Sequence, residues 1–256
     1  MRLGTCRLCQ QHRELCDSHA LPNSLFNYIL RKSDGKAIAV TDDPTTPTQY
    51  TADTWDTELL CQDCEESLNN RYDRYGMAVF RGHIGTVSRG SAGVTITGVD
   101  RRRLRMFFLS VLWRMSISSH PSYSNIDLPY AWEEELHDAL RADRHVPSAR
   151  FTVTVYKLRD STRTGSFDAE ALRSFIMAPF GRSFGSFISV CFLFLGFFVE
   201  VFLPRVPKAY STRTGVLHGT SRVFFAPYAE VLEIPEIMQL LVRGLHKEHV
   251  GLSRVG

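Results

Sequence analysis

Two Cys-x-x-Cys motifs in the first quarter of the chain constrain its fold more than any other feature of the sequence. The first contains Cys6 and Cys9, and the second contains Cys61 and Cys64. Two such motifs can bring four thiolates to one point, which is what a closed tetrahedral zinc site requires. In a reducing compartment, paired motifs of this kind indicate metal binding more than disulfides. The sequence therefore predicts that these cysteines hold a structural Zn²⁺.

Two further potential ligands, Cys16 and His19, lie between the motifs in the segment Cys-Asp-Ser-His. Three interpretations of His19 stay open: the general base of a hydrolytic site, a zinc ligand together with Cys16, or a structural hydrogen-bonding residue. Cys16 is a candidate metal ligand on the second interpretation and an ordinary core residue otherwise. The function of the chain therefore depends largely on the role of His19.

The composition is that of a folded globular protein, with 256 residues, 44% hydrophobic and 22% charged. The first residues carry no apolar signal segment, so we expect a cytoplasmic location. Residues 187–203 form an apolar run, but it contains Glu200 and Gly196 and is short for a membrane span, which needs about 20 apolar residues. We expect two buried strands around Gly196, and no membrane association.

Charge is unevenly distributed along the chain. Residues 1–79 contain eight Lys and Arg and twelve Asp and Glu, a net charge of −4, which leaves +7 for the remainder of the total of +3. Contacts with nucleic-acid phosphates need positive charge. We therefore expect such contacts from the second part of the chain, with an arginine cluster as the candidate: Arg101, Arg102, Arg103 and Arg105. The alternative is that this cluster is the solvated start of a helix.

Sequence patterns divide the chain into a first domain at 1–81, a Gly/Ser/Thr-rich connector at 82–98, and a larger α+β domain at 99–256. After Cys64, apolar residues at helical spacing predict a helix that begins at the second motif. Later patterns predict a helix from Leu104 buried on most faces, helices that begin near Pro129, Asp168 and Pro235, and strands near 151–156 and 222–226.

The order of three motifs suggests a family. Cys-x-x-Cys is followed by Ser-His-Ala-Leu-Pro at 18–22 and then by Leu-Leu-Cys-Gln-Asp-Cys-Glu at 59–65. This order resembles the HNH endonuclease-like zinc-finger proteins, and in particular a bacterial branch with Ser-His-x-x-Pro. The resemblance covers about residues 6–75. It implies an α+β protein with an N-terminal zinc-bound treble-clef finger, HNH-like with ββα order, followed by a larger α+β domain.

In active members of that family, the resemblance implies a single divalent ion, Mg²⁺, Mn²⁺ or Ni²⁺, and a histidine that takes a proton from the attacking water. His19 takes the position of this base, and Asn69 takes the last position of the motif. Ser18 stands where the family usually has an aspartate ligand, so it is a degenerate ligand position. Asp56 stands in place of the middle asparagine. Glu65 or Glu66 is a candidate for a substitute carboxylate.

The resemblance implies a metal-dependent hydrolase that cleaves phosphodiester bonds of nucleic acid, with DNA as the expected partner and bacterial defence as the expected setting. The alternative function is that of a catalytically degenerate zinc-finger module that binds nucleic acid or protein. A protein partner or a homo-oligomer is compatible with both interpretations.

Overall fold

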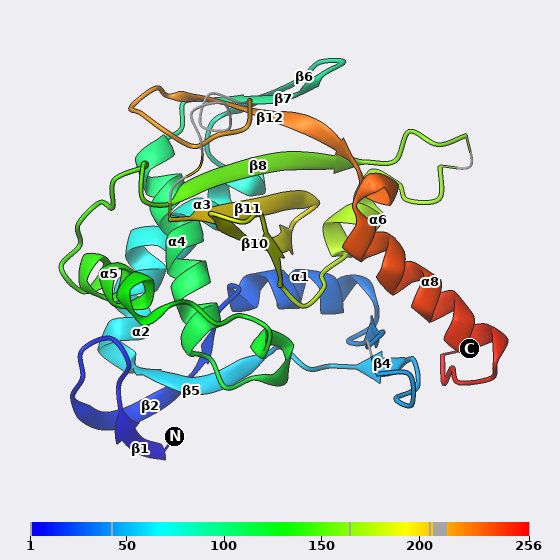
Figure 1. Cartoon of the computed structure of the whole chain (residues 1–256), viewed down its shortest axis with the longest axis horizontal. Coiled ribbons are helices and arrows are strands. Elements are labelled where there is room, and N and C mark those ends of the chain that lie inside the picture. The colour runs from blue at the N-terminus through cyan, green and yellow to red at the C-terminus, as the bar shows by residue number, and fades with distance from the viewer. Residues whose placement is uncertain (1, 42, 164, 205, 207–213, 256) are drawn as a thin grey trace.

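The largest part of the α+β fold is a seven-stranded sheet (Figure 1). The computed structural model describes residues 2–41, 43–163, 165–204, 206 and 214–255. Within these residues the sheet has the order β6-β7-β12-β8-β11-β10-β9, and neighbours pair antiparallel except for β12 and β8, which are parallel. Its strands are β6 (Thr86–Arg89), β7 (Gly93–Thr97), β8 (Thr152–Arg159), β9 (Phe180–Ser183), β10 (Ile188–Phe194), β11 (Phe197–Leu203) and β12 (Val223–Glu230).

The N-terminal segment forms a smaller antiparallel sheet of β1 (Arg2–Thr5), β2 (His12–His19) and β5 (Asp56–Cys61). Helix α1 (Asn23–Lys32) and the hairpin of β3 (Ala37–Ala39) and β4 (Gln49–Thr51) lie between β2 and β5 in the chain. After β5 the chain enters α2 (Gln62–Leu68), a π-helical turn η1 (Asn69–Asp73) and α3 (Arg74–Phe80). The predicted helix at the second cysteine motif is therefore confirmed.

The remaining helices follow the predicted pattern. They are α4 (Arg101–Ile117), α5 (Tyr130–Arg141), α6 (Ala169–Ser174) and α8 (Pro235–His249), with short 3₁₀ turns η2 (Pro121–Tyr123) and η3 (Val231–Glu233). Residues 104–115 of α4 are all buried, as the apolar residues around the whole helix predict. The side chains of Asp100 and Asp168 accept hydrogen bonds from the first backbone N–H groups of α4 and α6, respectively.

The apolar run at 187–203 forms the hairpin of β10 and β11, as predicted. Leu195 and Gly196 have φ angles of 49° and 73°, so the connection is a two-residue turn with both central residues in the left-handed region. Phe194 and Phe197 pair across the start of the hairpin. Among the described residues, no helix combines the length and the apolar character needed to cross a membrane.

One apolar cluster contains buried side chains from both the N-terminal segment and the larger sheet. The ring of Phe80 in α3 lies 5.4 Å from that of Phe108 in α4 and 4.9 Å from that of Phe197 in β11. Helices α3 and α4 approach closely, because a Cβ atom at Gly76 would lie 2.5 Å from ring atoms of Phe107. The division into domains at 1–81 and 99–256 stays a prediction, and such a boundary crosses this shared core.

Candidate metal centre and adjoining polar cavity

Four cysteines converge as the two motifs predict. The sulfur atoms of Cys6, Cys9, Cys61 and Cys64 all lie within 4.8 Å of one another, and the Sγ atoms of Cys9 and Cys61 are 3.9 Å apart. A tetrahedron with Zn–S bonds of about 2.3 Å has S–S edges of about 3.8 Å. The cluster therefore has the ligand type, the number and nearly the spacing that a structural Zn²⁺ requires.

Local backbone structure holds these sulfur atoms in place. The turn between β1 and β2 is closed by a hydrogen bond from the Gln10 N–H to the Cys6 carbonyl (2.9 Å), with Gln10 at a φ angle of 63°. Cys61 ends β5 and is the N-cap of α2. Its N–H donates to the Cys6 Sγ at 3.4 Å. The strand end and the turn are thus linked through the metal-binding atoms themselves.

Four thiolates that bind one metal would bring four negative charges to one point. Burial, together with the neighbouring sulfur atoms of Cys61 and Cys6, raises the pKa of the Cys64 thiol well above its usual range. Four thiolates can coexist at this point only when a positive ion compensates their charge, and Zn²⁺ supplies that charge in closed Cys₄ sites.

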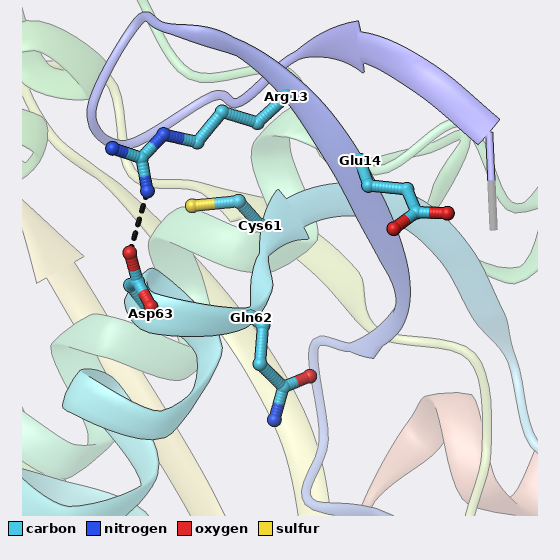
Figure 2. A pocket seen from close by; sticks show the side chains of 5 residues that line it. All are labelled: Arg13, Glu14, Cys61, Gln62 and Asp63. Carbon is cyan, nitrogen blue, oxygen red and sulfur yellow. Dashed lines mark hydrogen bonds and ion pairs between the residues drawn. The ribbon is translucent and has the colours of Figure 1, made fainter.

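Cys16 does not join the metal cluster. Its Sγ instead donates a hydrogen bond to the Gln62 Oε1 at 3.1 Å. Gln62 lines a pocket of about 300 Å³ on the outer side of β2 and the start of α2, where Arg13 forms an ion pair with Asp63 (Figure 2). The interpretation of Cys16 as a zinc ligand paired with His19 is therefore not supported by the geometry.

His19 and Asn69, the two predicted catalytic residues, line the same cavity of about 490 Å³. Glu65 lines it too, one helical turn before Asn69, so both side chains lie on one face of the helix. Burial raises the pKa of the Glu65 carboxyl group, although Arg114 and the hydroxyl group of Ser18 oppose this shift, and its buried Oε2 has no well-formed hydrogen bond within the described residues. Glu66, the other candidate carboxylate, is exposed, and its Oε1 accepts from Gln62.

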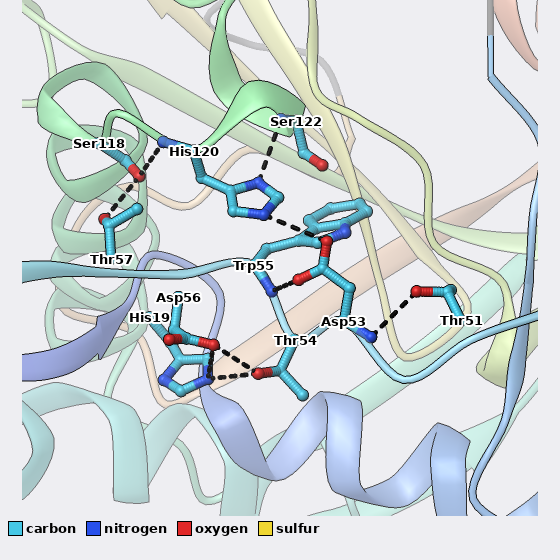
Figure 3. Close-up of polar contacts among 10 residues, drawn as sticks. All are labelled: His19, Thr51, Asp53, Thr54, Trp55, Asp56, Thr57, Ser118, His120 and Ser122. Carbon is cyan, nitrogen blue, oxygen red and sulfur yellow. Dashed lines mark hydrogen bonds and ion pairs between the residues drawn. The ribbon is translucent and has the colours of Figure 1, made fainter. Parts of the chain in front are cut away.

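The imidazole of His19 is only 9% exposed at the end of β2. Its Nε2 lies 3.2 Å from the Thr54 Oγ1, and Thr54 donates to the Asp56 Oδ1 at 2.8 Å (Figure 3). Burial lowers the pKa of His19 below its ordinary value of 6.5, although Asp56 opposes this shift. The ring is therefore neutral near pH 7 and can accept a proton.

The loop that contains Thr54, directly before β5, is held in place from the other side by His120. Its Nε2 lies 3.2 Å from the Asp53 Oδ2, and its Nδ1 accepts from the Ser122 N–H at 3.1 Å (Figure 3). Asp53 Oδ1 in turn accepts from the Trp55 N–H at 2.9 Å. Both ring nitrogens of His120 are thus occupied, which indicates a structural role for this residue.

Ser18, the predicted degenerate ligand position, is not among the residues that line the cavity, although its hydroxyl group lies close enough to Glu65 to lower the pKa of that carboxyl group. It is fully buried, and its Oγ accepts a hydrogen bond from the Leu60 N–H at 3.2 Å. The hydroxyl group therefore stabilises the pairing of β2 with β5. The carboxylates among the residues that line the cavity are those of Glu65 and Asp73.

A buried ion pair at the same cavity is not predicted by the motif. Arg114 in α4, which is 1% exposed, donates two hydrogen bonds to the Asp73 carboxylate, at 2.7 and 2.8 Å. Its Nη1 also donates to the His19 carbonyl oxygen at 3.0 Å. One sequence signal could have indicated this ion pair: Arg114 lies within the apolar stripe of residues 104–115, and a buried guanidinium requires a carboxylate partner.

The predicted arginine cluster separates into two groups. Arg103 donates to the backbone carbonyls of Arg71 and Asn70, at 2.6 and 2.9 Å. Arg101, Arg102 and Arg105 line a second cavity of about 370 Å³ at the start of α4. A role of the cluster in nucleic-acid binding stays a prediction.

Comparison of the chain with protein-family models, with curated proteins and with solved structures finds no match. The chemistry of the site is therefore inferred from its own residues.

Proposed function

We propose that the chain is a metal-dependent hydrolase that cleaves phosphodiester bonds of nucleic acid, with DNA as the expected substrate. The observation that carries this proposal is the convergence of His19, Glu65 and Asn69 on one polar cavity, with Glu65 directly after Cys64 of the cysteine cluster in the chain. A neutral base, a buried carboxylate and an amide are the groups that this chemistry requires.

We further propose that β2, β5 and the helix from α2 to α3 form an HNH-like treble clef. The turn with Cys6 and Cys9 lies between β1 and β2, and Cys61 and Cys64 lie at the junction of β5 and α2. The order is strand, strand and helix, as the resemblance implies, with α1 and the β3–β4 hairpin inserted between the strands. The structural zinc would fasten the helix to the turn and so fix Glu65 and Asn69 relative to His19.

Each residue has a distinct role in the proposed reaction. His19 takes a proton from the attacking water at Nδ1, because Thr54 donates its hydroxyl proton to Asp56 and therefore accepts a hydrogen bond from the His19 Nε2–H, which orients the ring. Glu65 and Asn69 would hold a divalent ion, Mg²⁺, Mn²⁺ or Ni²⁺, which would compensate the charge that develops on phosphate oxygens. Arg81 also lines the cavity, and its buried Nε has no described partner, so it is suited to binding a phosphate oxygen.

The test is cleavage of plasmid DNA by the zinc-loaded protein with added Mg²⁺, Mn²⁺ or Ni²⁺. We expect His19→Ala and Glu65→Gln each to reduce the rate at least about 100-fold, the lower range for general-base catalysis. His12→Ala is the matched control, because His12 lies on the same strand but is exposed at its other end. Zinc content should be equal in all variants. Absence of cutting by the wild type with every metal, or equal cutting by His19→Ala, would refute the proposal.

The burial of Ser18 favours the second candidate function, a binding module whose finger is a scaffold, because the strand then contributes no ligand to a metal. Metal analysis separates the two functions. The hydrolase binds a second ion after soaking with Mn²⁺, and Glu65→Gln loses it. The binding module retains only its zinc. Replacement of Ser18 by Asp does not serve as a test, since the new carboxylate would be buried within the sheet.

A further inference from the structure

The second cavity, at the start of α4, has a strongly unbalanced set of charges. It is lined by Arg101, Arg102, Arg105, His145 and His218, with small and apolar residues between them. None of the described residues that line it is Asp or Glu. The segments 144–151 and 214–222, which include the lining residues 145–148 and 217–219, contain no acidic residue in their sequence either.

Arg105 is the least expected of these residues, because its side chain is 6% exposed and no carboxylate of the described chain pairs with it. Its one protein hydrogen bond in the described structure runs from Nη1 to the Phe151 carbonyl, at 3.1 Å. Burial alone lowers its pKa to about 10. A buried guanidinium with so few partners is costly unless an anion compensates it.

Arg101 is similar. Its Nη2 donates to the Val216 carbonyl at 3.0 Å, but its buried Nε has no partner among the described residues. Two other arginines provide a contrast. Arg114 is buried in an ion pair with Asp73, and Arg182 forms ion pairs with Glu200 and Glu236. Carboxylates thus compensate Arg114 and Arg182, whereas Arg101 and Arg105 line a cavity whose described lining contains no carboxylate.

We propose that this cavity is a binding site for a phosphate group, bound by Arg101, Arg102 and Arg105. Guanidinium groups bind phosphate oxygens in pairs of parallel hydrogen bonds, and three of them can neutralise a dianion. A volume of about 370 Å³ is within the range of small-ligand sites. The phosphate can belong to a free nucleotide or to a nucleic-acid backbone, and both present the same group to the arginines.

The site is separate from the cavity of His19 and Glu65. Arg101 and Arg114 lie 13 residues apart in α4, which corresponds to about 20 Å along an α-helix. The proposed phosphate site is thus independent of the proposed hydrolase activity, and its test measures binding and not cleavage.

The experiment is calorimetric titration of the full-length, zinc-loaded protein with pyrophosphate. We expect saturable binding that Arg102→Ala weakens about tenfold, as the loss of a charge-assisted hydrogen bond predicts. Arg254→Ala is the control, because Arg254 is exposed near the C-terminus. His19→Ala should bind pyrophosphate as the wild type does. Absence of saturable binding by the wild type, or equal binding by Arg102→Ala, would overturn the proposal.

Arg105→Met gives a second, independent readout. If Arg105 only stabilises the fold, its replacement should lower the melting temperature. An arginine kept for an anion should leave the melting temperature without ligand unchanged or higher, and abolish the increase that pyrophosphate produces in the wild type. Competition by ADP, or by a short oligonucleotide without terminal phosphates, then identifies which source of phosphate the site prefers.

Discussion

At the scale of single residues, the ion pair of Asp73 and Arg114 links the cavity to the core. Arg114 contacts both the helix that contains Glu65 and the carbonyl of His19, so it fixes two sides of the proposed active site at once. The sequence indicates His19 through its motif. It does not indicate Asp73, since one acidic residue in a long helix has no pattern that distinguishes it from surface charge.

Removal of the Asp73 charge should therefore destabilise the protein strongly. Asp73→Asn leaves the Arg114 guanidinium buried without compensation, and we expect the free energy of unfolding to fall by about 3–5 kcal/mol. Urea denaturation measures this change. The comparison is Asp63→Asn, which breaks the exposed pair with Arg13 and should change stability little. Equal effects of the two substitutions would contradict the role assigned to the buried pair.

The pH dependence of cleavage should reflect the buried position of His19. Its pKa is lowered by burial, so the ring stays neutral at pH 6.5 and above and becomes protonated only at lower pH. We expect the rate to be constant around neutrality and to fall on the acid side with a midpoint below 6.5. The free energy of unfolding should also decrease as the pH falls. Folding lowers the pKa of His19, so the unfolded state binds the proton more readily than the folded state does. NMR titration of the ring is a direct check, and a midpoint above 7 would rule out this environment.

At the scale of elements, periodicity predicts most of the helices and strands. The helix from Leu104, the hairpin around Gly196 and the cap at Asp168 follow from local patterns, because burial and capping act within a few residues. The strand order does not follow, since the parallel pairing of β12 with β8 joins segments about 70 residues apart. The π-helical turn at 69–73 is also absent from any sequence pattern, although it contains both Asn69 and Asp73.

Two helical glycines should respond oppositely to alanine. At Gly76 the new methyl group would lie 2.5 Å from the ring of Phe107, and we expect a loss of about 1–3 kcal/mol from overpacking between α3 and α4. At Gly244 in α8 the nearest atoms lie at 3.6 Å, an ordinary contact, so alanine should stabilise by about 0.5–1 kcal/mol. Thermal denaturation of both variants measures the difference, and destabilisation at both positions would contradict the packing described for α8.

At the scale of the whole molecule, the N-terminal segment and the larger sheet share apolar contacts. Phe80 packs on Phe108, Phe194 and Phe197, so the first 81 residues do not bury their apolar surface by themselves. The sequence suggests two domains because the cysteine motifs and the Gly-rich connector are local features. Contacts between distant segments leave no such trace in a single sequence.

Zinc removal should consequently affect the entire protein. We expect one zinc ion per chain and a single cooperative unfolding transition, which a strong chelator moves to lower temperature. Calorimetry, with near-ultraviolet circular dichroism as a second probe, measures both properties. Two separate transitions, with only the first sensitive to chelator, would show that the domains are independent.

The length of α4 has a consequence for the choice of substrate. If one duplex contacts both the arginine cavity at the start of this helix and the His19 cavity near its end, the contacts lie about 20 Å apart. At a rise of 3.4 Å per base pair, that separation corresponds to about six base pairs. The length of the helix would then set the distance between the two contacts. Shorter duplexes would reach only one of the two cavities, and cleavage would occur at a fixed number of base pairs from the phosphate that the arginines bind.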